Sequence, residues 1–186
     1  LEHALQAFKV NVRGKLVLDV GASTGGFTHC LLEHGAELVY ALDVGYGQLD
    51  YRLREDPRVK VMERVNARQP FKLPEQVSLA SIDVSFISLI KVIPSVVEHI
   101  KPQEHLIALI KPQFEAGPKQ VGKGGVVRDP TIHALTIGRV CLWSIQHGLR
   151  IRGVVPSPIE GATGNREFFV LLQKEGASHQ DLTLVP

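Results

Sequence analysis

The sequence predicts an α/β fold in which one mostly parallel sheet carries helices on both faces. Short runs rich in β-branched residues alternate with amphipathic stretches through roughly five or six units, which is typical of a parallel sheet wrapped by helices. The last two apolar runs are joined only by residues 156–165. Because this loop is too short for a parallel crossover, we expect those two strands to pair antiparallel.

The elements follow from hydrophobic periodicity, strands from apolar runs bounded by turn residues and helices from apolar positions three or four apart. Strands are expected near residues 16–20, 37–43, 59–62, 78–83, 105–110, 150–155 and 167–173. Helices are expected near residues 2–10, 25–34, 47–55, 86–99 and 130–147. Seven strands closed by an antiparallel hairpin are typical of the Rossmann-like fold of class I methyltransferases.

The composition indicates one globular domain, because 186 residues with 44% hydrophobic and 22% charged side chains can bury one good-sized core. The formal net charge of +2 does not by itself indicate a nucleic-acid partner. Cys30 and Cys141 are too far apart in sequence to suggest a disulfide framework or a zinc site, so a reducing cytoplasm fits. No apolar run approaches the ~18 residues that span a bilayer. Since Leu1 already lies in a helical pattern, we expect residues to precede it.

A glycine-rich turn follows the first strand and opens the next helix. Its spacing of Gly21, Gly25 and Gly26 matches neither the P-loop nor the dinucleotide fingerprint. Asp19 ends the first strand, and Asp43 ends the second at about the ~20-residue separation expected of an acid that binds a ribose. These features predict a nucleoside-type ligand, and the Asp-x-Gly form makes S-adenosylmethionine the leading candidate.

Three charged residues abut apolar runs at strand ends: Asp83, Lys111 and Glu167. Each has a simpler interpretation, respectively a helix N-cap, a solvated strand end and an edge-strand charge that opposes aggregation. If the three converge, desolvation can weaken the hold of the lysine on its proton while the carboxylates fix its position. Such an amine can act as general base towards a ribose hydroxyl.

Seven ordered motifs together resemble the TlyA (hemolysin A-like) branch of the FtsJ-type RNA methyltransferases; they occupy residues 19–28, 43–49, 64–68, 83–89, 111–117, 124–129 and 157–167. The resemblance covers nearly the whole chain. It implies a methyltransferase domain over residues 1–174, a C-terminal tail over 175–186, and an S4-type RNA-binding domain upstream. It also implies S-adenosylmethionine-dependent methylation of a ribose 2′-hydroxyl in ribosomal RNA by a Lys-Asp-Lys-Glu tetrad.

Within that tetrad, Asp83, Lys111 and Glu167 match the Asp, the second Lys and the Glu, whereas the first Lys is expected immediately before Leu1. For the cofactor, the resemblance implies a site formed by Asp19, Gly21, Ala22, Ser23, Gly25, Gly26, Phe27, Asp43, Asn66 and Asp83. Asp43 is expected at the ribose and Asn66 near the adenine, although Asn66 also fits a simple turn. A basic loop with Lys119, Lys123 and Arg128 is a candidate for RNA phosphate contacts, with a solvated loop as the alternative.

Three other functions stay open: methyl transfer to a different acceptor, a membrane-lytic hemolysin, and a catalytically idle RNA-binding module. A base-methylating enzyme would favour an Asn/Asp-Pro-Pro-Tyr-type motif where this chain has Asp83 followed by Val-Ser-Phe. A pore former would need a spanning helix or long amphipathic strands, which are not evident. We therefore expect a cytoplasmic enzyme acting on ribosomal RNA within a ribosomal subunit, with no metal and no membrane partner.

Overall fold

The computed structural model describes residues 1–176 and contains a seven-stranded sheet in the order β3-β2-β1-β4-β5-β7-β6. The strands are β1 (Leu16–Val20), β2 (Leu38–Leu42), β3 (Val59–Met62), β4 (Val77–Ile82), β5 (Ile100–Ile110), β6 (Leu149–Pro156) and β7 (Phe168–Lys174). The predicted tail from 175 extends over residues 177–186, which lie outside the described residues.

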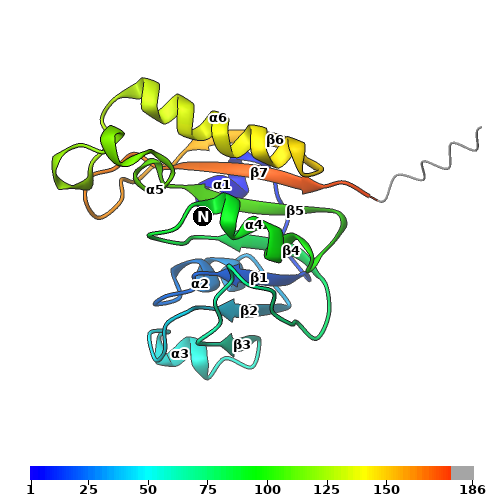
Figure 1. The fold of residues 1–186 in the computed structure, drawn as a ribbon. Helices are drawn as coiled ribbons and strands as arrows, with labels where there is room; N and C mark the ends of the chain where they lie inside the picture. The colour runs from blue at the N-terminus through cyan, green and yellow to red at the C-terminus, as the bar shows by residue number, and fades with distance from the viewer. Residues whose placement is uncertain (177–186) are drawn as a thin grey trace, which may run out of the picture.

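The closing hairpin is the only break in the parallel arrangement of these strands. β7 lies between β5 and β6 and pairs antiparallel with both, whereas every other pairing is parallel. The predicted mostly parallel sheet with an antiparallel last strand is therefore confirmed. The carboxyl ends of the parallel strands and the loops that follow them gather at one edge, at the left of Figure 1.

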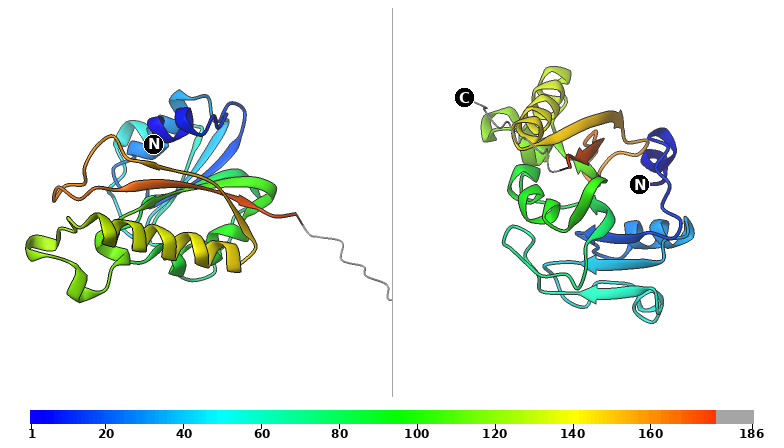
Figure 2. Two further views of the ribbon diagram at one scale, coloured as in Figure 1. Left: turned by 90° about the horizontal axis from the view of Figure 1, so that it is seen from above. Right: turned by 90° about the vertical axis from the view of Figure 1, so that its right-hand side faces the viewer.

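Helices cover both faces of the sheet, as predicted (Figure 2). One face carries α1 (Glu2–Ala7), α2 (Gly26–Glu33) and α3 (Tyr51–Arg54), and the other carries α4 (Ile93–Val97) and α6 (Pro130–Gln146). The period of two along a strand separates the two cores, since Val17 packs towards α1 and α2 while Leu18 packs towards α4 and α6. Both faces are buried, which explains the near-continuous apolar runs of the strands.

The predicted helix over 86–99 is wrong in its extent. The segment forms a 3₁₀ turn, η1 (Leu89–Lys91), followed by the short α4. Phe86 has a left-handed φ of +64°, which no helix accommodates, and Pro94 lies in the first turn of α4, where its missing N–H costs nothing. The predicted helix over 47–55 is also too long. In the structure α3 begins only after Asp50, whose carboxylate accepts the backbone N–H of Arg52 and so caps the helix.

Three short helical turns follow β5, and the periodicity did not predict them: α5 (Pro112–Glu115), η2 (Pro118–Gln120) and η3 (Lys123–Gly125). They project beyond the carboxyl edge of the sheet, as Figure 1 shows. Among the described residues, no helix is both long enough and apolar enough to cross a membrane.

Candidate functional site

The glycine-rich turn is anchored by Asp19, which is fully buried at the end of β1. Its carboxylate accepts hydrogen bonds from Thr28 Oγ1 on α2 at 2.7 Å and from Ser81 Oγ on β4 at 2.8 Å. Burial raises the pKa of Asp19 to about 6, although both hydroxyls favour its charged form. The side chain therefore joins α2 to the sheet from inside and has no surface that a ligand could touch.

Gly21 lets the turn pass close to β4. Its φ is +84°, and a Cβ at this position would lie 2.1 Å from the backbone oxygen of Asp83. Gly25 meets a similar limit, since its φ is +103° and a Cβ would lie 2.1 Å from Leu53 Cδ1. These two glycines serve close packing, a requirement that no other residue type meets at a left-handed φ.

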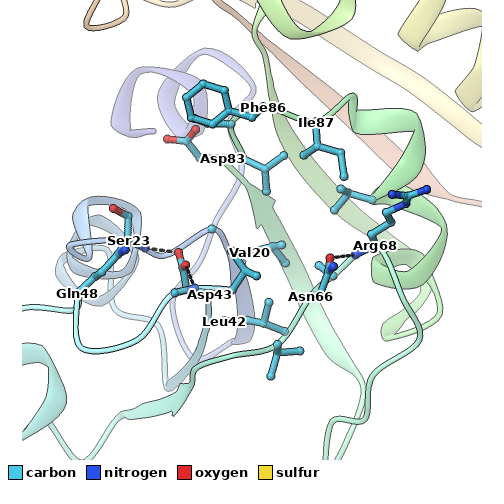
Figure 3. Close-up of a pocket in the computed structure, with 18 residues that line it drawn as sticks. Val20, Ser23, Leu42, Asp43, Gln48, Asn66, Arg68, Asp83, Phe86 and Ile87 are labelled. Atoms are coloured by element: carbon cyan, nitrogen blue, oxygen red, sulfur yellow. Dashed lines mark hydrogen bonds between the residues drawn. The ribbon is translucent and has the colours of Figure 1, made fainter.

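Asp43, at the end of β2, orders the loops on either side of it. Its Oδ2 accepts the backbone N–H of Ser23 at 2.8 Å, and its Oδ1 accepts that of Gly45 at 2.7 Å. Figure 3 shows the contact with Ser23 at the side of a cavity between the two loops. Two backbone donors leave further lone pairs on this carboxylate, so it can also accept hydroxyl groups from a ligand.

The cavity beside Asp43 has a volume of about 510 Å³, within the ~300–1,000 Å³ range of small-molecule sites. It brings together five of the residues expected to bind the cofactor: Gly21, Ser23, Asp43, Asn66 and Asp83. Asn66 makes the expected turn, because its Oδ1 accepts the backbone N–H of Arg68 at 3.0 Å. Its amide NH₂ has no acceptor within the part of the chain that the structure describes, so it can still donate to a ligand.

The remaining expected cofactor residues lie elsewhere. Asp19 and Ala22 are buried beneath the turn. Gly25 and Gly26 line a separate cavity next to α3, together with His29. Phe27 packs on Phe169 of β7 with ring centroids 6.2 Å apart. Direct contact of Ala22, Gly25, Gly26 and Phe27 with a cofactor stays a prediction, whereas the buried Asp19 supports the turn from inside.

The side chains of Asp83, Lys111 and Glu167 converge at the carboxyl edge of the sheet. Lys111 Nζ lies 2.6 Å from Asp83 Oδ1 and donates to Ser85 Oγ at 3.1 Å. Glu167 is 8% exposed and accepts a hydrogen bond from Gln113 Nε2 at 3.3 Å. Burial raises the pKa of Glu167 above its ordinary value, against the opposing effects of Lys111 and Gln113. An amine and two carboxylates therefore share a partly desolvated site.

The simpler interpretations of these three residues are wrong. Asp83 is not a helix cap, because the 3₁₀ turn begins after Ser88. The Lys111 side chain is only 14% exposed, so it is not a solvated strand end. Glu167 precedes a strand that is paired on both sides, so it does not protect a sheet edge.

A second cavity, of about 560 Å³, opens on the other side of Asp83. Its lining includes Leu1, Phe27, Asp83, Ile159 and Glu167. Asp83 is thus shared between this cavity and the one beside Asp43. The arrangement offers adjoining spaces for two ligands, with Asp83 at their junction and Lys111 paired to it.

Sequence reasoning missed Glu115, which connects the two loops of the cluster. Its side chain is buried, and its oxygens accept hydrogen bonds from Ser88 Oγ at 2.5 Å and from the backbone N–H of Leu89 at 2.6 Å. Burial raises the pKa of Glu115, against the effect of those hydrogen bonds. The signal was present, since a glutamate four residues after Lys111 lies in one of the recognised motifs.

The basic loop with Lys119, Lys123 and Arg128 is exposed at the same edge. It is fastened by the buried Asn165, whose Oδ1 accepts the N–H of Val127 and whose amide donates to the Gly125 carbonyl, both at 2.9 Å. Within residues 1–176 there is no cluster of histidine, cysteine or acidic side chains that could hold a metal, and both cysteines are free.

Comparison with known proteins gives a consistent result. A family model described as FtsJ-like methyltransferase matches residues 1–174. The candidate rRNA methyltransferase YqxC of Bacillus subtilis is 46% identical over 98% of this chain and 66% of its own length. The 16S/23S rRNA (cytidine-2′-O)-methyltransferase TlyA of Mycobacterium tuberculosis is 47% identical over 92% of this chain and 65% of its own length. The chain thus spans slightly less than two thirds of these relatives.

Solved structures agree with the fold. A protein of Lactococcus lactis described as a candidate hemolysin is 48% identical, with a TM-score of 0.91 over 94% of this chain and 85% of that one. Two more distant S-adenosylmethionine-dependent methyltransferases are each 18% identical to this chain. One superposes with a TM-score of 0.68 over 94% of this chain and 97% of its own. The other superposes with a TM-score of 0.70 over 92% of this chain and 96% of its own, so the fold is shared.

Proposed function

Because the chain belongs to the FtsJ-like methyltransferase family, we propose that it transfers a methyl group from S-adenosylmethionine to a ribose 2′-hydroxyl of ribosomal RNA. The observation that carries the proposal is the position of Asp83. It lines both the cavity beside Asp43 and the second cavity, and it is paired with Lys111. A donor in one cavity and an acceptor in the other would meet at this pair.

The cavity beside Asp43 suits the nucleoside part of the cofactor. Asp43 would accept the ribose hydroxyls, and the amide NH₂ of Asn66 would donate to the adenine. Gly21 and Ser23 would face the methionine end. When bound, the cofactor supplies an electrophilic methyl group on a positively charged sulfur, and the neighbouring carboxylates favour that charge.

At the acceptor, Lys111 would serve as the general base. Its Nζ would accept the proton of the 2′-hydroxyl, and the bound cofactor would supply the methyl group that this oxygen takes up. Asp83 and Glu167 hold the amine in place and stabilise the ammonium that forms. Positioning of donor and oxygen accounts for much of the remaining acceleration, because the substitution is in line.

The first lysine of the tetrad is proposed to precede Leu1. Leu1 lines the same cavity as Asp83 and Glu167, so a residue immediately before it would lie near the cluster. Ribosomal RNA is proposed as acceptor because the curated relatives carry that substrate in their names. The exposed basic loop at the same edge would contact its phosphates.

The test incubates the protein, in its longest natural form, with ribosomal subunits and labelled cofactor. Lys111→Ala is expected to abolish transfer and to leave cofactor binding unchanged by calorimetry. Lys60→Ala, at an exposed position on β3, is the matched control and is expected to behave as the unaltered protein. Unchanged transfer by Lys111→Ala would refute its role, and a labelled nucleotide that alkali still cleaves at its 3′ side would refute ribose methylation.

A further inference from the structure

A further cavity lies at the opposite edge of the sheet, near the amino ends of the parallel strands. Its volume is about 410 Å³. It is bounded by the end of α1 and by strands β5, β6 and β7, and its lining contains four basic side chains: Lys9, Lys15, His105 and Arg152. The start of α1 borders the charged cluster, so the two sites lie at opposite ends of one helix.

Local backbone features place these side chains together. Lys9 follows α1 in a left-handed conformation with φ +56°, which is unusual for a residue other than glycine. Arg152 lies where the pairing of β6 with β7 shifts register, between Ile151 and Gly153. A Cβ at Gly153 would lie 2.9 Å from the Phe8 ring, so the absence of a side chain there lets the end of α1 approach β6. The cavity is therefore assembled from segments that lie far apart in the chain.

The cavity carries an excess of positive charge. Among the described residues, the carboxylate that forms ion pairs with these side chains is Glu104, which lies 3.1 Å from Lys15 and 3.9 Å from His105. Lys9 and Arg152 have no ion-pair partner among the described residues. Burial, with help from Lys15 and Arg152 and against Glu104, lowers the pKa of His105. Two exposed cations thus stay available beside a neutral ring.

We propose that this cavity binds phosphate groups of the RNA backbone, as a second contact surface distinct from the catalytic edge. The proposal rests on the proposed function, which supplies an RNA as substrate. Lysine and arginine side chains are the groups that contact phosphates in nucleic-acid complexes, and such contacts fix register rather than read sequence. A phosphate brings acceptor oxygens to a site that offers mainly donors.

The distance between the two sites determines which RNA can use both. The part of β5 that pairs with β7 runs from His105, at the cationic cavity, to Ile110, next to Lys111, so at about 3.3 Å per residue the strand separates the two sites by roughly 17 Å. A folded ribosomal RNA can span that distance around the protein, whereas a dinucleotide in the catalytic cavity is too short to reach the second site. The surface should therefore matter for folded RNA only.

The test measures binding of transcribed 23S rRNA and of a short RNA, a dinucleotide, over a series of salt concentrations. Lys9→Asn and Arg152→Gln remove the two unpaired charges, and asparagine accepts the left-handed backbone at position 9. Each substitution is expected to weaken 23S rRNA binding about eightfold at ~0.1 M salt and to reduce the salt slope by about 0.9. Binding of the short RNA and of S-adenosylmethionine is expected to stay unchanged, which also shows that the variants fold.

Equal affinity and slope for the variants and the unaltered protein would overturn the proposal. So would the same loss in Lys60→Gln, which removes an exposed charge from β3, outside the cavity. Binding of inorganic phosphate that is lost in Lys9→Asn and Arg152→Gln, while both variants keep the full affinity for 23S rRNA, would overturn the assignment to RNA in favour of a small phosphate ligand. Because binding is measured without methyl transfer, failure of the proposed function would be recognised separately.

Discussion

Replacing Asp19 by asparagine should change how the stability of the protein depends on pH. The carboxylate is fully buried, and burial raises its pKa to about 6 from an ordinary value of 3.8. The folded state therefore binds this proton more tightly than the unfolded chain does. Stability contributed by the group is present below the unfolded pKa and is lost as pH rises through the folded pKa.

The magnitude follows from the shift. Roughly two pKa units at ~1.36 kcal/mol each correspond to about 3 kcal/mol, of which about 2 kcal/mol falls between ~pH 4.5 and ~pH 7.5. The asparagine side chain of the variant cannot ionise, yet it keeps both hydrogen bonds if one of the Thr28 and Ser81 hydroxyls turns to accept from its amide. The variant should lack this part of the pH dependence.

The assay is urea unfolding of both proteins across that pH range, with the difference between their unfolding free energies plotted against pH. Taking the difference removes the titration of other groups, including Glu115 and Glu167, whose pKa values are also raised. We expect the variant to gain about 2 kcal/mol relative to the parent as pH rises. Parallel curves would show that Asp19 titrates normally and would refute the role of burial.

Three further substitutions test the site. Asp43→Ala should weaken S-adenosylmethionine binding tenfold or more, at ~1.4 kcal/mol per factor of ten, and an unaltered dissociation constant in calorimetry would contradict the ribose assignment. Gly21→Ala should destabilise the fold by about 1–3 kcal/mol in urea unfolding. Gly14→Ala is the control, because Gly14 has a similar φ but a Cβ there would have no atom within 4 Å. Equal losses of stability in the two variants would contradict the close approach of Gly21 to Asp83. Glu115→Ala should lower the free energy of unfolding by about 1–3 kcal/mol, because it leaves the Leu89 N–H unpaired. Glu115→Gln keeps an acceptor for that N–H, so equal stability of the two variants would argue against the role of Glu115 in holding the loop.

Much of the catalytic edge was predictable because parallel strands end on the same side of a sheet. Asp83 and Lys111 each follow an apolar run, and their convergence needs only the correct fold class. The bounds of β1 and β3 were predicted to the residue, since each is a short apolar run between turns. The helix predicted over 86–99 failed at Phe86, whose left-handed backbone ends the helical pattern at a residue type that rarely adopts that conformation.

The residues that sequence reasoning missed depend on partners far away in the chain. Glu115 could be recognised as buried only when β4 and β5 were placed side by side, because its partners are Ser88 and Leu89. The cationic cavity likewise needs Gly153 to bring α1 to β6. Side-chain periodicity reports which face a residue occupies, and it does not report what lies opposite.

By itself the sequence determined the class of fold, the two acidic strand ends and the motifs that identify the family, since each depends on residue type and spacing within one short segment. Tertiary structure alone decided that Asp19 supports the turn from inside while Asp43 faces the cavity, although both are aspartates at strand ends. The reason is geometric: the carboxylate of Asp19 meets hydroxyls from α2 and β4, whereas that of Asp43 meets two loop backbones beside an open space.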